Sequence, residues 1–174
     1  FAAFVLNPQL GFPVTMHSPE AAIDNSGLGV FGRATISFND KVDVTAGLRF
    51  DHESSDATLN TFFAPAIAAA NLVTAAESFN DVSPQFAVGY RVTPQSTAYV
   101  SAARGYKAGG FNPAALPGTE SYSTEQSWNY EGGVKARFAD RVSLTAAVFR
   151  IDWDDLQVNI PNPFVPGQFY IGNA

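Results

Sequence analysis

Long stretches of this chain alternate apolar and polar residues one by one. In residues 28–38 the even-numbered positions are apolar or glycine, whereas the odd-numbered positions include Arg33, Thr35 and Ser37. Successive side chains of a β-strand point to opposite faces, so a period of two predicts a strand with one apolar and one polar face. The same alternation returns in five further segments, which are residues 42–53, 85–92, 98–103, 129–138 and 142–148. The pattern predicts an all-β chain.

These segments fall into pairs joined by short polar turns near residues 40, 94 and 140. We therefore expect three hairpins, over residues 27–53, 82–107 and 125–158. Longer connections separate them. We expect a loop at 1–26, two long loops at 54–81 and 108–124, and a loop with the start of a further strand at 159–174. The alanine-rich stretch 62–76 is expected to hold a small helix within its loop.

The alternation of short turns with long loops is typical of outer-membrane barrels, which have short periplasmic turns and long extracellular loops. Strands of about ten residues or more can cross a bilayer at a tilt. We predict an antiparallel segment, about six to seven strands, of a large transmembrane β-barrel, with 54–81 and 108–124 extracellular. Six strands alone would leave both edges facing lipid, so residues 1–174 are expected to form part of a barrel domain.

Composition narrows the class of protein further. Only 15% of the residues are charged, against about 25% in ordinary soluble domains, and 10 cations against 16 acids give a net charge of −6. An acidic chain without a basic stripe is not expected to bind nucleic acid. The absence of cysteine excludes disulfides, a thiolate zinc site and a cysteine nucleophile. The chain begins at Phe1 without a visible signal peptide, so we expect a processed chain or a fragment.

Motifs that could carry chemistry have simpler interpretations here. Residues 27–32 fit GxGxxG, but a proline-rich stretch precedes them and a strand is predicted to follow, which excludes a dinucleotide site. Acidic residues at 152, 154 and 155 are expected to be a solvated strand end rather than a calcium site. Neither His17 nor His52 has a second histidine at metal-ligand spacing. No nucleophile–base constellation is present, so we expect no enzyme activity, no cofactor and no metal site.

Aromatic residues near the ends of the predicted strands are expected to lie at the membrane–water interface. The set comprises Tyr90, Trp128, Tyr130 and Trp153. Packing in an ordinary core is the alternative for these rings. From Phe149 to Trp153 the apolar positions change from even to odd, which indicates either a β-bulge or inward-pointing aromatic residues.

Several stretches, in order along the chain, resemble TonB-dependent outer-membrane receptors. The most specific is residues 104–112 (RGYKAGGFN), which is similar to the family's "RGFKAGGFN" passage from strand to loop. The others are 47–53 (GLRFDHE), 83–86 with 89–90 (SPQF, GY), Glu125 with 129–135 (NYEGGVK), 147–158 (AVFRIDWDDLQV) and 171–174 (IGNA). Two positions depart from the family pattern: Tyr106 stands where Phe is usual, and Gly132 stands in place of a lipid-facing Leu.

This resemblance implies a barrel of about 22 strands around a plug domain, of which this chain would supply a middle segment without the plug. It implies a receptor in the outer membrane of a Gram-negative cell that imports a scarce nutrient by energy-coupled transport. The expected ligand is a ferric siderophore, with cobalamin or a glycan as alternatives. The expected partners are outer-membrane lipid, lipopolysaccharide and, through the missing plug region, the TonB complex. A passive porin or adhesin barrel and a soluble β-sandwich that binds carbohydrate are the alternative functions.

Ligand contacts are expected where the strands enter the long loops, at the outer mouth of the barrel. The candidates are Arg49, Asp51, Arg104, Lys107, Phe111 and Asn112. Cations at this position could attract an anionic chelate, and aromatic rings could pack against its organic part. Alternatively, the same residues hold the loops together or contact lipopolysaccharide.

Overall fold

The computed structural model describes residues 2–6, 13–64, 66, 70–113, 118–138, 141–162 and 168–174. All regular structure in them is β: β1 (Ala2–Leu6), β2 (Pro13–Phe38), β3 (Val42–Ala64), β4 (Asn71–Thr93), β5 (Ser96–Lys107), β6 (Gly110–Phe111), β7 (Ser121–Tyr122), β8 (Glu125–Phe138), β9 (Val142–Asp154), β10 (Gln157–Pro161) and β11 (Phe169–Asn173). Within these residues no helix is long and apolar enough to cross a membrane.

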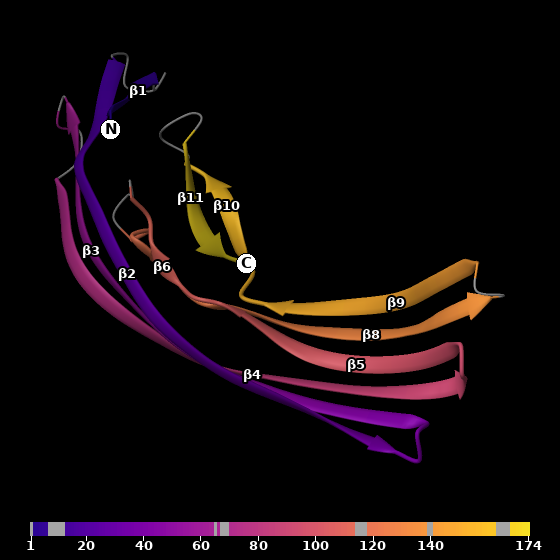
Figure 1. Ribbon diagram of the computed structural model, residues 1–174. Helices are drawn as coiled ribbons and strands as arrows, with labels where there is room; N and C mark the ends of the chain where they lie inside the picture. Colours follow the sequence, from indigo (N-terminus) through magenta and orange to yellow (C-terminus); the bar gives the residue numbers. More distant parts are fainter. Residues whose placement is uncertain are drawn as a thin grey trace.

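Seven of the strands form one antiparallel sheet in the order β1-β2-β3-β4-β5-β8-β9. The sheet is a single curved layer, and the ends of β2, β4 and β8 lie together with the starts of β3, β5 and β9 at one end, which we call the short-turn end (Figure 1). Two small antiparallel pairs, β6-β7 and β10-β11, stand at the other end. Neighbouring strands of the main sheet pair in chain order apart from the small hairpin, which is the up-and-down connectivity predicted from the sequence.

The cross-strand registers give the sheet two chemically different faces. From Glu20 to Arg91 and from Ser96 onward in β5, β8 and β9, even-numbered residues pair with even-numbered residues, so that Val44 lies opposite Val88 and Val88 opposite Val100. In the half of the sheet nearer the short turns, this face is apolar and exposed. We call it the outer band; its large residues are Leu28, Val30, Ile36, Phe38, Val44, Leu48, Phe50, Val82, Phe86, Val88, Tyr90, Val92, Val100, Tyr130, Val134, Phe138, Val142, Leu144 and Val148.

The odd-numbered face is the inner one. Phe111 on β6 packs against Ala57 and Leu59 of β3, both odd-numbered, and β6 lies within the concave side of the sheet (Figure 1). This inner face carries most of the polar and charged residues of the strands, as the alternation predicted.

The expected loop at 1–26 is wrong for its described part. Residues 2–6 form β1, and β2 begins at Pro13. The prolines of this segment favoured the prediction of a loop, because proline lacks the amide for ladder hydrogen bonds. Pro13 opens the strand, and Pro19 lies where the β2–β3 register shifts between His17 and Glu20. Residues 7–12 lie outside the described part of the chain.

The expected loop at 54–81 and its small helix at 62–76 are also wrong. The β3–β4 ladder continues without a register shift to Thr61–Asn71, so the connection shrinks to residues 65–70. Beyond Phe50 the alternation reverses its sense: the outward positions become polar, as at His52 and Ser54, and apolar residues turn inward under Phe111. Small side chains and this reversal made the segment look like a loop. Of the stretch assigned to the helix, residues 65 and 67–69 lie outside the described part.

The other two long connections contain short hairpins. The described part of 108–124 holds the β6-β7 pair. In residues 159–174, β10 continues to Pro161, and β11 pairs back onto β10 rather than onto β9. The β8–β9 register runs from Gln126–Asp154 to Phe138–Val142 without a shift. This excludes a bulge near Phe149, so Phe149, Ile151 and Trp153 belong to the inner face.

The first short turn has the geometry of a type I′ hairpin. Asn39 and Asp40 have φ values of 50° and 52°, and the Lys41 amide donates to the Phe38 carbonyl at 3.1 Å. A left-handed conformation matches the twist of the flanking strands and is least strained for glycine. The second turn lies between Thr93 and Ser96, and residues 139–140 of the third are outside the described part.

Replacing Asp40 with glycine is expected to raise the free energy of unfolding by about 0.5–1 kcal/mol, because it relieves the left-handed strain. The Asp40 carbonyl, which accepts from Arg91 at 2.6 Å, is retained. Urea unfolding of the intact protein measures the change. As a control, Asp43→Gly lies just outside the turn and should destabilise. A lower unfolding midpoint for Asp40→Gly would contradict the turn assignment.

Candidate functional site: the inner face and its outer hairpins

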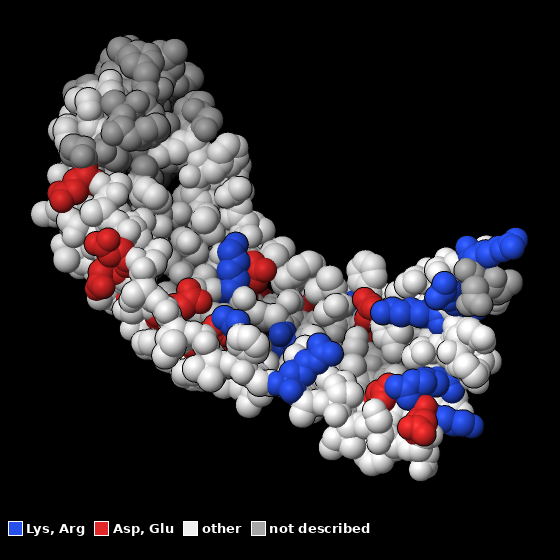
Figure 2. Space-filling view, in the orientation of Figure 1, with Lys and Arg blue, Asp and Glu red and all other residues white. Residues whose placement is uncertain are grey.

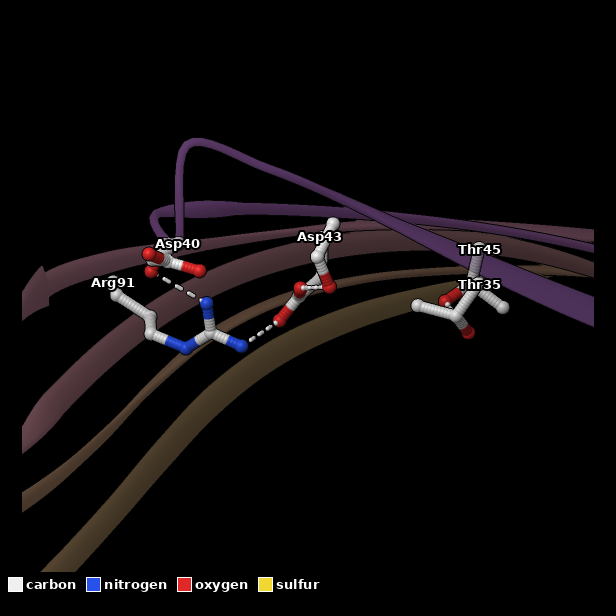
Figure 3. Close-up of polar contacts among 6 residues, drawn as sticks. Thr35, Asp40, Asp43, Thr45 and Arg91 are labelled. Atoms are coloured by element: carbon white, nitrogen blue, oxygen red, sulfur yellow. Dashed lines mark hydrogen bonds and ion pairs between the residues drawn. The ribbon is translucent and has the colours of Figure 1, made fainter.

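The inner face near the short turns is held by hydrogen bonds that cross three strands (Figure 3). Arg91 of β4 donates to Asp43 Oδ2 of β3 at 2.6 Å and to the Asp40 carbonyl in the β2–β3 turn. Asp43 also accepts from Ser37 Oγ of β2 at 2.5 Å. Thr35 and Thr45 face one another at 2.8 Å between their hydroxyl oxygens. These side-chain hydrogen bonds link β2, β3 and β4 along the inner face of the sheet.

Arg49 and Asp51, two of the predicted ligand residues, pair with each other. Arg49 Nε and Nη2 donate to the two oxygens of Asp51 at 2.6 Å each, and the guanidinium lies 6.0 Å from the centre of the Phe31 ring. Gly29 permits this arrangement, since a Cβ there would lie 2.8 Å from Asp51 Oδ1. The pair is oriented along the inner face, with the Arg49 side chain half exposed.

Arg104, a third predicted ligand residue, fills the fork where β5 separates from β4. The β4–β5 ladder ends at Gln85–Ala103, which frees the Val82 carbonyl. Arg104 Nη1 donates to that carbonyl and to Asp81 Oδ1, each at 2.5 Å, and Ser83 Oγ donates to Asp81 Oδ2 at 2.6 Å. The Asp81 side chain is only 2% exposed. Asp81 was not identified from the sequence; its distance from Arg104 in the chain left no local signal.

The three remaining candidates have different surroundings. Lys107 is exposed at the end of β5. Phe111 is buried in a small apolar cluster with Ala57 and Leu59. Asn112 is 3% exposed and joins two outer hairpins: its Nδ2 donates to the carbonyls of Thr119 and Ile171, and its Oδ1 accepts from the Ile171 amide. The arrangement at Phe111 and Asn112 is that of residues which hold the loops together.

Two further amide side chains, missed in the sequence, tie the same hairpins. Gln157 Nε2 donates to the carbonyls of Ala108 and Ser123 at 2.8 and 3.0 Å. Asn173 Nδ2 donates to the Asp155 carbonyl at 2.7 Å, and its Oδ1 accepts from the Ser123 amide at 2.8 Å. These partners lie 18 to 50 residues away in sequence and could not be inferred from spacing alone.

Replacing Asn112 with alanine is expected to speed hydrogen exchange of the Ile171 amide, because that amide loses its acceptor. The free energy of unfolding should fall by about 1–3 kcal/mol, since buried backbone groups are left without partners. Hydrogen-exchange mass spectrometry of the intact protein measures the first effect. Asn159→Ala, at an exposed position of β10, is the matched control. Unchanged exchange in Asn112→Ala would contradict the loop-tying role.

The predicted interface aromatics do not all share one face. Tyr90, Trp128 and Tyr130 are even-numbered, and the rings of Trp128 and Tyr130 stack with centres 6.0 Å apart. Arg150 lies opposite Tyr130 and Asp152 opposite Trp128 in the register. Trp153 pairs with Ser127 and therefore lies on the inner face, apart from the other three.

Charge is also distributed unevenly along the sheet (Figure 2). Lys and Arg gather at the short-turn end, whereas Asp and Glu predominate in the half that carries the outer hairpins. Among the described residues, no group of three or more His, Cys, Asp or Glu has an arrangement that could hold a metal ion.

The sheet with an apolar outer band and a polar inner face matches a known family. The family model for "TonB dependent receptor-like, beta-barrel" covers residues 6–174. This chain belongs to the TonB-dependent receptor family. The curated relatives include the pesticin receptors of Yersinia pestis and Yersinia enterocolitica, each 31% identical over 134 residues, or 75% of this chain. The chain spans 19% of the length of these relatives.

Solved structures agree with this assignment. The ferric yersiniabactin uptake receptor FyuA from Yersinia pestis superimposes with a TM-score of 0.70 at 25% identity, covering 84% of this chain and 22% of that one. The siderophore receptor PiuA from Acinetobacter baumannii gives a TM-score of 0.62 at 21% identity, over 92% of this chain and 21% of that one. The second likeness supports the fold alone.

The TonB-dependent receptor segment is thus a wall of a transmembrane β-barrel, and its inner face lines the barrel interior. The single-layered sheet does not fit the alternative of a soluble β-sandwich, which needs two packed sheets. The family consists of receptors and transporters rather than enzymes, and its members are outer-membrane proteins.

Proposed function

We propose that the receptor containing this segment binds a ferric siderophore and imports it across the outer membrane of a Gram-negative cell, with energy supplied through TonB. The observation that carries the proposal is the family match over residues 6–174. FyuA, at 25% identity, is named as a ferric yersiniabactin uptake receptor. Cobalamin and glycans are the alternative solutes, and the family match favours active import over a porin or an adhesin.

We propose that the outer band contacts lipid and that the hairpins β6-β7 and β10-β11 lie on the extracellular side. Short turns are periplasmic in bacterial outer-membrane barrels, and long loops are extracellular. Trp128 and Tyr130 would then lie at the outer margin of the bilayer, where aromatic rings are enriched. The exposed ion pair of Arg150 and Asp152, 2.8 Å apart, is on the same face and suits contact with lipopolysaccharide headgroups.

An uptake assay tests the import function. The full-length gene that contains this segment is expressed in a Gram-negative strain lacking its own siderophore receptors, and cells are supplied with radiolabelled ferric siderophores. We expect iron uptake that requires TonB and is lost when the tonB gene is deleted. Uptake that persists without TonB would indicate a passive pore. Uptake of labelled cobalamin or oligosaccharide instead of iron would contradict the siderophore assignment.

A further inference from the structure

A pocket of about 260 Å³ lies on the inner face beneath the β6-β7 hairpin. Its floor is formed by β2–β4, and its roof by residues 108–111 and Tyr122. The lining that matters chemically comprises Glu53, Ser55, Phe79, Gly109, Phe111 and Tyr122. A volume below about 300 Å³ is small for a whole drug-sized ligand, so the pocket fits a single functional group or side chain.

Glycine at position 109 lets the roof come close to the floor. A Cβ on Gly109 would overlap the Tyr122 carbonyl oxygen and lie 2.8 Å from the Phe79 ring. Phe111 closes the same side through its contacts with Ala57 and Leu59. Close packing of the roof against the floor therefore fixes the shape of the pocket.

The polar groups of the pocket lack partners in the described part of the chain. Ser55 is 4% exposed, yet its Oγ makes no hydrogen bond. Buried polar atoms are nearly always satisfied, so an orphan hydroxyl in a pocket indicates a missing partner. The Glu53 carboxylate has no ion pair among the described residues. Arg49 is bonded through two nitrogens to Asp51 instead.

The surrounding electrostatics favour a cation. Asp51, Glu53 and Asp81 gather around Tyr106, whose hydroxyl is buried without a partner. The charges of Glu53, Asp81 and Asp51 all act on this hydroxyl. Two arginines balance two of these three carboxylates, which leaves one negative charge over. The aromatic rings of Phe79, Phe111 and Tyr122 can pack against a cationic group or against the apolar stem that carries it.

We propose that this pocket binds one basic group, an ammonium or a guanidinium, carried on a short apolar stem. Glu53 accepts from the cation, the Ser55 hydroxyl accepts a further N–H, and the aromatic walls pack against the stem. The basic group belongs either to a solute in the barrel or to a Lys or Arg side chain from another part of the receptor. The assignment does not depend on which nutrient the receptor imports.

Calorimetric titration of the full-length receptor in detergent with agmatine, a guanidinium on a butyl stem, tests the proposal. The variants are Glu53→Gln and Ser55→Ala, and the control is Glu20→Gln, which removes the same charge at an exposed position of β2. If the group comes from a solute, wild type and Glu20→Gln bind agmatine, Glu53→Gln binds at least about tenfold more weakly, and Ser55→Ala several-fold more weakly. Ser55→Ala should keep the wild-type melting temperature, because its hydroxyl has no partner within the described residues.

If the receptor's own side chain fills the pocket, wild type does not bind agmatine, Glu53→Gln melts at a lower temperature than Glu20→Gln, and Glu53→Lys melts lower still. Either pattern supports the basic-group site and identifies the source. Equal agmatine affinity in wild type and Glu53→Gln would overturn it. So would the absence of binding combined with equal melting temperatures for Glu53→Gln and Glu20→Gln. Failure of siderophore uptake would leave both readouts unaffected.

Discussion

Replacing Asp81 with asparagine is expected to lower the free energy of unfolding by about 3–5 kcal/mol, because it leaves Arg104 as a buried charge without its counter-ion. The Arg104 side chain is 16% exposed and contacts Asp81 at 2.5 Å. Its guanidinium also satisfies the Val82 carbonyl that the end of the β4–β5 ladder leaves free. Loss of the pair should therefore open the fork between the two strands.

Urea unfolding of the full-length receptor in detergent measures this loss. Asp43→Asn is the matched control, since it breaks the more exposed Arg91–Asp43 pair, whose side chains are 41% and 29% exposed, and should cost no more than about 1 kcal/mol. The double variant Asp81→Leu with Arg104→Met should recover most of the stability, because it removes both charges together. Equal losses of unfolding free energy in Asp81→Asn and Asp43→Asn would show that the Arg104–Asp81 pair contributes no more to stability than the Arg91–Asp43 pair.

Replacing Val100 with arginine is expected to destabilise the membrane-embedded receptor by about 2–4 kcal/mol, the cost of a cation on the lipid face near the bilayer centre. Val100 is 60% exposed on the outer band, midway along β5 and opposite Val88 and Gly132. Its side chain has no polar neighbour in these registers. The arginine would have to displace lipid or distort the strand.

Ser101→Arg is the matched control for this substitution. Ser101 is the next residue on the same strand, on the inner face and opposite Glu131, so a new cation there has a carboxylate within reach. Its effect on stability should be small. Both variants are compared by the fraction that folds into lipid vesicles across a urea series. Similar losses for Val100→Arg and Ser101→Arg would contradict the assignment of the two faces.

Prediction from the sequence worked best where one face of a strand is continuously apolar. In the half of the sheet nearer the short turns the alternation is strict. There the sequence predicted strands such as β8 and β9 close to their observed positions. In the part of β3 that follows Phe50, the outer face is no longer apolar. Because its outward positions at His52, Ser54 and Asp56 are polar, this part of the sequence resembles a loop. The long upper parts of β3 and β4 were missed for this reason.

Prediction of the candidate site worked less well, because its contacts are long-range. Arg104 was singled out, but its partner Asp81 was not. Asn112 was identified as a candidate for ligand contact, and the structure gives it three hydrogen bonds to Thr119 and Ile171. Ligand contact stays a prediction for all six candidates, which are Arg49, Asp51, Arg104, Lys107, Phe111 and Asn112. Glu53 ends the family stretch 47–53 and Ser55 follows it, but nothing in that stretch indicates a pocket. The pocket forms only because β6-β7 folds over β3.

The sequence by itself determined the two-faced strands, their hairpin pairing and the family, because alternation and turn residues are local properties of the chain. The scarcity of charge follows from the same cause: the outer band carries none of it. The tertiary structure alone decided how far the strands extend, which charges neutralise one another, and where the inner face is hollow. Those features depend on register and on contacts between residues far apart in the chain, and no local pattern encodes them.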